Sequence, residues 1–216
     1  FLLIILGFFM MVPIIVQLIY DEFNGTFIYS SLVTIFIGTL FLLSNLDQNK
    51  KLKLQQAFLL TSLSWIGIAT FGSLPFIFSS LELTFSDAFF ESMSGITTTG
   101  STVIEDLNNT PKAILIWRST LQWLGGIGIV IMAITVMPLL NVGGMQLFKM
   151  ESGDTTEKIL PKTREIAFNI VSIYFFLSAA CAIAYFFSGM NIFDSIAHAM
   201  TTIATGGFST YNESIG

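Results

Sequence analysis

Five long segments of this sequence carry almost no charge, and they constrain its fold more than any other feature. They cover residues 1–20, 27–46, 54–81, 112–148 and 165–189. A helix of about 20 apolar residues crosses the roughly 30 Å hydrocarbon core of a bilayer. Only 11% of the chain is charged, against roughly 25% in soluble domains. The sequence therefore predicts an all-α integral membrane protein.

The charged residues between these segments predict its orientation. Residues 47–53 contain three lysines, and residues 149–164 contain four basic side chains. Basic loops mark the cytoplasmic side of a membrane protein, which leaves the acidic stretches 21–25 and 105–111 outside. The sides alternate consistently, so we expect a multi-pass protein of the cell inner (cytoplasmic) membrane.

Two of the long segments contain residues that interrupt helices. Pro75 is expected to kink or end the segment 54–81. The 37 residues of 112–148 would form a straight helix of about 55 Å, so this helix must tilt, break or project into the cytoplasm. The candidate breaks are Gly125–Gly128, Pro138 and Gly143–Gly144. For the glycines, close packing between helices is an equally good explanation.

Two further segments, 84–96 and 191–203, are too short to span a bilayer, and each is followed by a polar run. We expect two re-entrant helices, the first capped by Ser86 or Asp87. A short helix that leads into a Thr/Gly-rich strand is how membrane proteins present backbone carbonyls to a dehydrated cation. The candidate cation-binding residues are Thr97, Thr98, Thr99, Gly100, Ala204, Thr205, Gly206 and Gly207.

The second short segment repeats the first. A shift of 107 residues pairs Asp87 with Asp194, Met93 with Met200, Thr98 with Thr205 and Gly100 with Gly207. The predicted organisation is a transmembrane hairpin (1–46), a span–pore-helix–filter–span repeat (47–148), a cytoplasmic loop (149–164) and a second repeat (165–216) that stops after its filter. Because a ring of carbonyls needs several strands, we expect two further copies beyond Gly216, or a dimer around one pore.

Three runs resemble a known family. Residues 94–102, 117–128 and 202–209 are similar to the membrane subunit of the bacterial Trk potassium uptake system, in the Trk/Ktr/HKT superfamily. The resemblance covers essentially the whole chain, including the N-terminal hairpin. It implies four repeats around one K⁺ pathway, of which this chain holds about the first half. It also implies a homodimer, a cytosolic nucleotide-binding regulatory subunit (TrkA-like), no enzymatic activity and no cofactor besides the transported K⁺.

The resemblance gives the glycines of the polar runs a specific role. In the family, the middle glycine of each filter helps to admit K⁺ in preference to Na⁺. Gly100 holds that place in the first run, and either Gly206 or Gly207 holds it in the second. The double glycine leaves two registers open.

Four charged or titratable residues lie within the short segments. Glu91 and His198 share one repeat position, and Asp87 and Asp194 share another. A charge inside a membrane segment is a functional candidate, but we favour a supporting role behind the filter for Glu91 and His198. The two aspartates are expected to cap their helices and to raise the local cation concentration.

Arg118 has two structural explanations. It could pair with Glu91 or Asp106, or it could lie at the outer membrane interface with Trp117 and Trp123.

Other functions have less support. A Na⁺-coupled carrier of another cation or small solute predicts inverted repeats, whereas these repeats begin on the same side. A hydrolase using Glu91 and His198 would lack a nucleophile motif. One His and one Cys cannot form a zinc site, and Gly125–Gly128 lacks the Lys-Ser/Thr of a phosphate loop. The basic loop residues are expected to orient the protein or bind a partner protein, not nucleic acid.

Overall fold

The computed structural model describes residues 1–44, 54–140 and 159–214, and these residues form helices without any β-strand. The helices are α1 (Leu2–Phe9), α2 (Met11–Ile19), α3 (Thr26–Leu43), α4 (Leu54–Gly72), α5 (Leu74–Ile77), α6 (Phe85–Ile96), α7 (Lys112–Leu140), α9 (Ile159–Phe187) and α10 (Ile192–Ile203). The predictions for residues 47–53, for Gly143–Gly144 and for 149–158 lie outside the described residues.

Five stretches of these helices are long and apolar enough to cross a membrane. They are Leu2–Ile19, Thr26–Leu43, Phe58–Ile77, Lys112–Met132 and Glu165–Phe187, and they match the five long segments of the sequence. The other two helices, α6 and α10, have 12 residues each and are therefore about 18 Å long. The chain is thus an all-α membrane protein with two helices that are too short to span.

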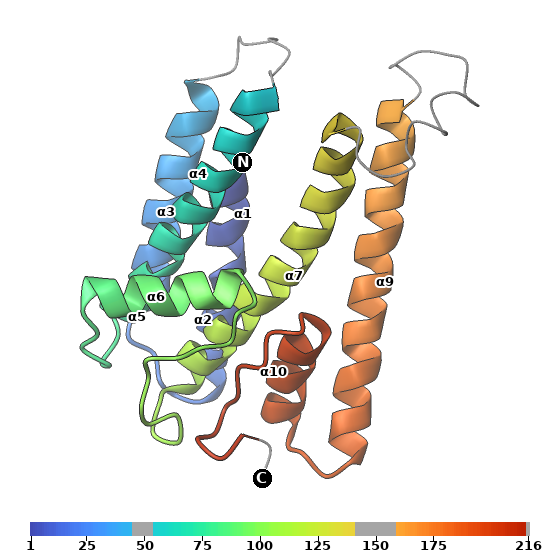
Figure 1. Cartoon of the computed structure of the whole chain (residues 1–216). Coiled ribbons are helices and arrows are strands. Elements are labelled where there is room, and N and C mark those ends of the chain that lie inside the picture. Colours follow the sequence, from blue (N-terminus) through green and yellow to red (C-terminus); the bar gives the residue numbers. More distant parts are fainter. Residues whose placement is uncertain (45–53, 141–158, 215–216) are drawn as a thin grey trace.

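The two short helices occupy the same half of the bundle. Figure 1 shows α4 and α9 running in the same direction, with α6 and α10 both near their far ends. α6 lies across the neighbouring spans. The two span-plus-short-helix units therefore have the same orientation, as the sequence repeat predicts.

The first span is interrupted, which the sequence analysis did not predict. α1 ends at Phe9 and α2 begins at Met11, with Met10 between them at φ −63° and ψ −13°. Pro13 explains the break, because it has no N–H to donate to the carbonyl of Phe9, four residues earlier. The helical angles of Met10 keep the two pieces in line enough for Leu2–Ile19 to serve as one span.

The other predicted interruptions have mixed outcomes. α4 ends at Gly72, and Pro75 lies in the first turn of α5, so this prediction is confirmed. α7, however, passes through Gly125–Gly128 and Pro138 without a break. Packing explains Gly125 instead, because a Cβ there would lie 2.0 Å from the carbonyl oxygen of Ile96.

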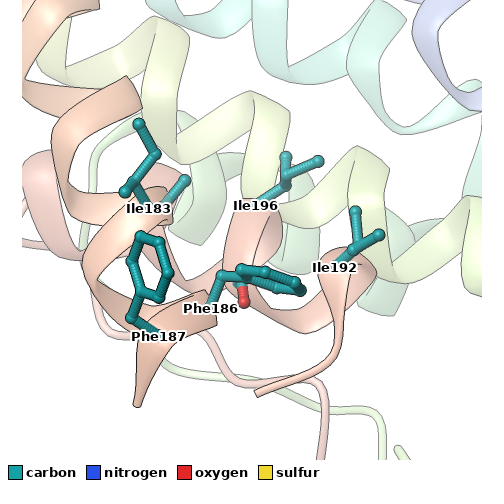
Figure 2. Close-up of a pocket in the computed structure, with 7 residues that line it drawn as sticks. Ile183, Phe186, Phe187, Ile192 and Ile196 are labelled. Carbon is teal, nitrogen blue, oxygen red and sulfur yellow. The ribbon is translucent and has the colours of Figure 1, made fainter. Parts of the chain in front are cut away.

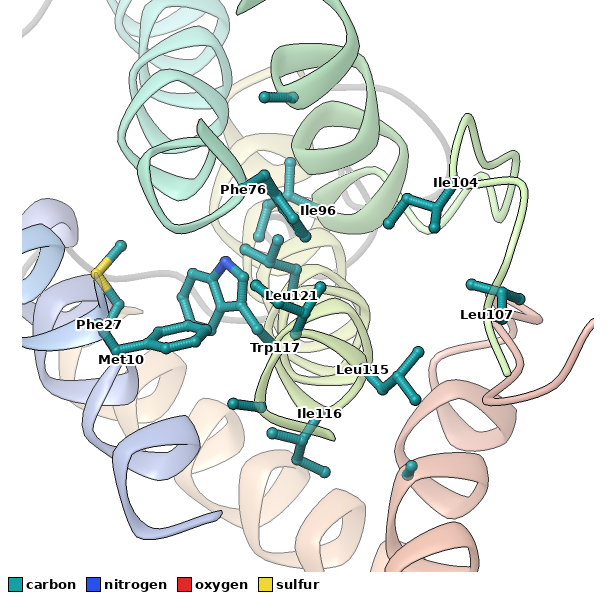
Figure 3. Close-up of a cluster of buried hydrophobic side chains, with 14 of the residues drawn as sticks. Met10, Phe27, Phe76, Ile96, Ile104, Leu107, Leu115, Ile116, Trp117 and Leu121 are labelled. Carbon is teal, nitrogen blue, oxygen red and sulfur yellow. The ribbon is translucent and has the colours of Figure 1, made fainter. Parts of the chain in front are cut away.

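α7 is the central helix of the described structure. It contacts α2, α6, α9 and α10, and 61% of its span is buried, whereas none of the α9 span is. Figure 3 shows Trp117 and Leu121 of α7 at the centre of the apolar core, against Phe27 and Phe76. The indole Nε1 of Trp117 donates a hydrogen bond of 3.0 Å to the carbonyl of Gly72.

Candidate functional site

The two short helices begin with the same cap. The Thr84 side chain accepts a hydrogen bond from the N–H of Asp87 (3.2 Å), and the Asn191 side chain accepts one from the N–H of Asp194 (2.9 Å). Thr84 and Asn191 also donate to the carboxylates of the same aspartates. Each cap therefore uses the side chain of the N-cap residue together with the aspartate three residues later.

The predicted caps of these helices are wrong by a few residues. Thr84, not Ser86 or Asp87, is the N-cap of α6, and Asn191, not Asp194, is the N-cap of α10. The reason is that Asp87 and Asp194 lie inside the first turn. Their N–H groups are the ones that need a partner there, and their negative charge favours the helix N-terminus.

The two short helices also end alike. Thr98 donates its N–H to Gly95 O, and Thr99 donates to Ser94 O, both at 2.9 Å. The same two hydrogen bonds recur at 2.9 Å in the second repeat, where Thr205 donates to Thr202 O and Gly206 donates to Thr201 O. This is the Schellman pattern of helix ends. The residue in the left-handed conformation is usually glycine, but here it is a threonine, with φ +57° at Thr98 and +55° at Thr205.

The chain beyond each helix end forms what we name the Thr/Gly segments, residues 97–100 and 204–207. Gly100 has φ +83° and Gly207 has φ +79°, and such angles favour glycine because it lacks a Cβ. Positive φ thus recurs at the same two positions of each segment. The backbone therefore aligns Gly100 with Gly207, in agreement with the 107-residue shift, and not with Gly206.

The two Thr/Gly segments lie against each other. A Cβ on Gly100 would be 1.9 Å from the carbonyl oxygen of Gly206, and a Cβ on Gly206 would be 2.3 Å from the amide carbon of Gln122. The Gln122 amide oxygen accepts a hydrogen bond of 3.1 Å from the N–H of Phe208. A side chain at either glycine would therefore displace backbone or a buried amide.

Glu91 ties the chain just after the first Thr/Gly segment to its short helix. Its carboxylate is fully buried and accepts hydrogen bonds from the Thr102 hydroxyl (2.9 and 3.0 Å) and the Val103 N–H (3.0 Å). It also forms an ion pair of 2.6 Å with the Nε of Arg118. Both carboxylate oxygens of Glu91 are thus bonded to protein.

Arg118 also contacts the two residues that follow the second Thr/Gly segment. Its Nη1 donates to the carbonyl of Ser209 at 3.0 Å, and its guanidinium lies 4.1 Å from the ring centre of Phe208. The side chain is 1% exposed, so the alternative placement at the membrane interface is wrong.

Asp106, the other predicted partner of Arg118, bonds elsewhere. The Asn109 side chain donates to its carboxylate at 2.7 Å, and this hydrogen bond lowers the pKa of Asp106. Trp123 donates its Nε1 to the Ser178 hydroxyl at 2.9 Å, so its polar atom also faces protein.

The second short helix binds the chain after its own Thr/Gly segment through different side chains. His198, which occupies the position of Glu91, lies 3.2 Å from the Thr210 hydroxyl through Nε2. The acid is one turn earlier, where Asp194 accepts from Thr210 (2.7 Å) and from the Tyr211 hydroxyl (2.8 Å). The hydrogen bond to Asp194 raises the pKa of Tyr211.

Sequence reasoning missed Gln122 and the link from Arg118 to the second segment. Both residues are polar side chains in a long apolar stretch, four positions apart and therefore on one helix face. That spacing was the available signal. Their partners could not be identified from sequence, because Phe208 and Ser209 are 86 and 91 positions away.

An apolar groove of about 470 Å³ lies between α9 and α10 (Figure 2). It is lined by Ala182, Ile183, Phe186, Phe187, Ile192, Ser195 and Ile196. Only the Ser195 side chain is polar, and neither Thr/Gly segment contributes to the lining. Within the described ranges, no group of three or more His, Cys, Asp or Glu side chains could hold a metal ion. The duplicated Thr/Gly segments are therefore the candidate site.

Comparisons with known proteins point to one family. Residues 24–216 match the family described as TrkH, cation transport protein. The Trk system potassium uptake protein TrkH of Escherichia coli (strain K12) is 44% identical over 211 residues, which cover 96% of this chain and 44% of that protein. The Trk system potassium uptake protein TrkI of Halomonas elongata is 40% identical over 213 residues, covering 98% and 43%.

A solved structure agrees with these sequence matches. The crystal structure of the potassium transporter TrkH from Vibrio parahaemolyticus superposes with a TM-score of 0.84 at 38% identity, over 98% of this chain and 42% of that one. The chain thus spans less than half the length of the relatives it matches. Its family match extends over nearly all of its own residues, and so the chain belongs to the TrkH family of cation transport proteins, multi-pass proteins of the inner membrane.

Proposed function

We propose that this chain forms part of a K⁺ uptake pathway, in which the two Thr/Gly segments supply backbone carbonyls to a selectivity filter. The observation that carries the proposal is the duplicated backbone: two short helices end in the same hydrogen bonds and the same pair of positive φ angles, and their segments meet at Gly100 and Gly206. The proposed K⁺ ligands are Thr97, Thr98, Thr99, Gly100, Ala204, Thr205, Gly206 and Gly207.

The chemistry of the segments fits a dehydrated cation. K⁺ filters replace the hydration shell of the ion with rings of backbone carbonyls. α6 and α10 direct their C-terminal ends, the negative ends of the helix dipoles, toward the Thr/Gly segments. Asp87, Glu91, Asp194 and His198 act behind these segments as supports, because their polar atoms are already bonded to protein.

Membership of the family supports the rest of the proposed assembly. The domains are the hairpin 1–46, the first repeat 47–148, the cytoplasmic loop 149–164 and the second repeat 165–216. Two further repeats complete the ring, the protein is a homodimer without enzymatic activity, and a cytosolic nucleotide-binding subunit gates it. K⁺ is the transported ion. The common direction of α4 and α9 counts against a carrier built from inverted repeats.

The test is K⁺ uptake by the full-length protein in a bacterium that lacks its own uptake systems. We expect the wild type to restore growth at low K⁺ and to exclude Na⁺. Gly100→Ser should reduce the discrimination between K⁺ and Na⁺, because its Cβ would displace the carbonyl of Gly206. Gly67→Ser is the matched control, since nothing lies within 4 Å of a Cβ at Gly67.

Two results would overturn the proposal. One is failure of the well-expressed wild type to take up K⁺ when supplied with its regulatory subunit. The other is unchanged ion discrimination in Gly100→Ser.

A further inference from the structure

We infer that Arg118 and Gln122 are positioning residues that hold the two Thr/Gly segments at a fixed spacing, and that this spacing contributes to ion discrimination. We name the pair the α7 clamp. The inference rests on the proposed function, because it assigns a task to residues behind the proposed filter. It differs from that function in concerning α7, which contains neither Thr/Gly segment.

The α7 clamp connects the two repeats through one helix face. Arg118 and Gln122 are one helical turn apart, so their side chains share a face. Arg118 pairs with Glu91, which holds the chain after the first segment, and donates to Ser209, just after the second. The Gln122 amide oxygen accepts a hydrogen bond from the N–H of Phe208, the first residue after the second segment. α7 therefore binds the backbone after the second segment directly, and it reaches the backbone after the first segment through Glu91.

The choice of arginine supports this link. Burying an ion pair is a poor source of stability, because the desolvation of two charges offsets most of their attraction. Apolar packing would serve a merely structural contact between α6 and α7 at least as well. A guanidinium, however, offers donors in several directions and stacks on aromatic rings. Arg118 uses these properties on Glu91, Ser209 and Phe208 at once.

Gln122 packs against Gly206, the glycine of the second segment that meets Gly100. Its side chain is fully buried, and its Nε2 lies 3.7 Å from the Cβ position of Gly100 and 2.6 Å from that of Gly206. This Nε2 has no hydrogen-bond partner among the described residues. The amide is therefore held by its oxygen and by its contact with Gly206, as expected of a group that presses the second segment against the first.

The experiment compares ion discrimination among α7 variants of the full-length protein. Arg118→Lys keeps a positive charge for Glu91 but loses the planar fork that reaches Ser209 and Phe208. Gln122→Met keeps the volume but removes the acceptor for the Phe208 N–H. Ser119→Ala is the matched control, because the Ser119 hydroxyl donates to the carbonyl of Leu115 in its own helix and to no other described residue. The readouts are the ratio of K⁺ to Na⁺ uptake and, separately, protein amount and thermal stability.

We expect Arg118→Lys and Gln122→Met each to lower the K⁺/Na⁺ ratio by up to about tenfold, the factor that matches the loss of one buried hydrogen bond. Ser119→Ala should keep the wild-type ratio. The inference is overturned if both variants keep the ratio while Gly100→Ser loses it, or if they lower only stability and amount. If Gly100→Ser also keeps the ratio, the proposed filter itself is wrong, which is a separate outcome.

Discussion

The two repeats share a backbone but not the side chains that hold it. α6 and α10 have equivalent caps, equivalent C-terminal hydrogen bonds and equivalent positive φ angles. Behind them, the first repeat relies on a buried ion pair, Glu91 with Arg118. The second relies on hydrogen bonds around Asp194, with a histidine in the place of the glutamate.

This difference indicates which part of the repeat is constrained. Side chains behind the Thr/Gly segments differ in charge and in position by a helical turn, yet the segments themselves keep the same angles to within a few degrees. The shared requirement is therefore the direction of the backbone groups. The two supports achieve it with different chemistry, so mutations in them should have different costs.

The largest expected difference is in the buried charges. Glu91→Gln leaves Arg118 buried without its counter-charge and should cost about 3–5 kcal/mol. His198→Gln removes one contact to Thr210 and should cost about 1 kcal/mol. Thermal unfolding of the purified full-length protein would measure both. As a control, adding Arg118→Met to Glu91→Gln should recover stability, and equal losses at Glu91 and His198 would contradict the comparison.

A smaller difference is expected from the adjacent glycines of α7, which each face one repeat. A Cβ on Gly125 would meet the Ile96 backbone oxygen at 2.0 Å, whereas one on Gly126 would meet the side-chain hydroxyl of Tyr174 at 2.5 Å and the backbone of Ala204 only at 3.2 Å. We expect Gly125→Ala to cost about 2–3 kcal/mol and Gly126→Ala about 1 kcal/mol.

Gly128→Ala is the control for these two glycines, because its nearest neighbour, Trp65, would be at an ordinary 3.7 Å. It should stabilise α7 by about 0.5–1 kcal/mol through helix propensity. A larger loss of unfolding free energy in Gly126→Ala than in Gly125→Ala would contradict this comparison of the two contacts.

The threonines in the left-handed conformation should behave alike in the two repeats. The left-handed conformation costs a non-glycine residue about 1–2 kcal/mol. A glycine avoids this cost, but it loses more conformational entropy on folding, which offsets part of the benefit. Thr98→Gly and Thr205→Gly should therefore each stabilise the protein by up to about 1 kcal/mol. A gain at one position and a loss at the other would show that the two helix ends are not equivalent.

The smallest expected effect concerns the titration of Tyr211. Its pKa is raised because its hydroxyl donates to Asp194. The hydrogen bond stabilises the folded protein fully below the ordinary tyrosine pKa, and this contribution is lost as the pH rises through the raised value. Asp194→Asn should lower the Tyr211 pKa toward its ordinary value, as measured by phenolate absorbance. Tyr211→Phe assigns the signal, and Asp87→Asn in the other repeat should leave it unchanged.

Much of the fold was predictable because it depends on local composition. Uncharged stretches of membrane length gave the five spans, and the 107-residue shift gave the correspondence of α6 with α10. The break at Met10 was missed because Pro13 acts four residues before itself. The cap at Thr84 was missed because several polar residues lie near the start of α6. Which of them is the cap depends on which N–H group of the first turn lacks a partner.

The arrangement behind the candidate site was less predictable. Sequence reasoning placed Glu91 and His198 in supporting roles and offered Glu91 as one partner of Arg118. It could not foresee that Arg118 also reaches Ser209, or that Gln122 packs against Gly206. These contacts join residues of different repeats, and the packing of α7 between α6 and α10 determines them.

The position of Arg118 also has a consequence for biogenesis. Glu91 precedes Arg118 by 27 residues, whereas Ser209 follows it by 91. A ribosome therefore delivers the carboxylate before the guanidinium, and the guanidinium long before the carbonyl it holds. Since a lone arginine inserts into lipid at a high cost, the pair can enter the membrane already neutralised. The carbonyl of Ser209 that Arg118 binds is thus translated after both members of the ion pair.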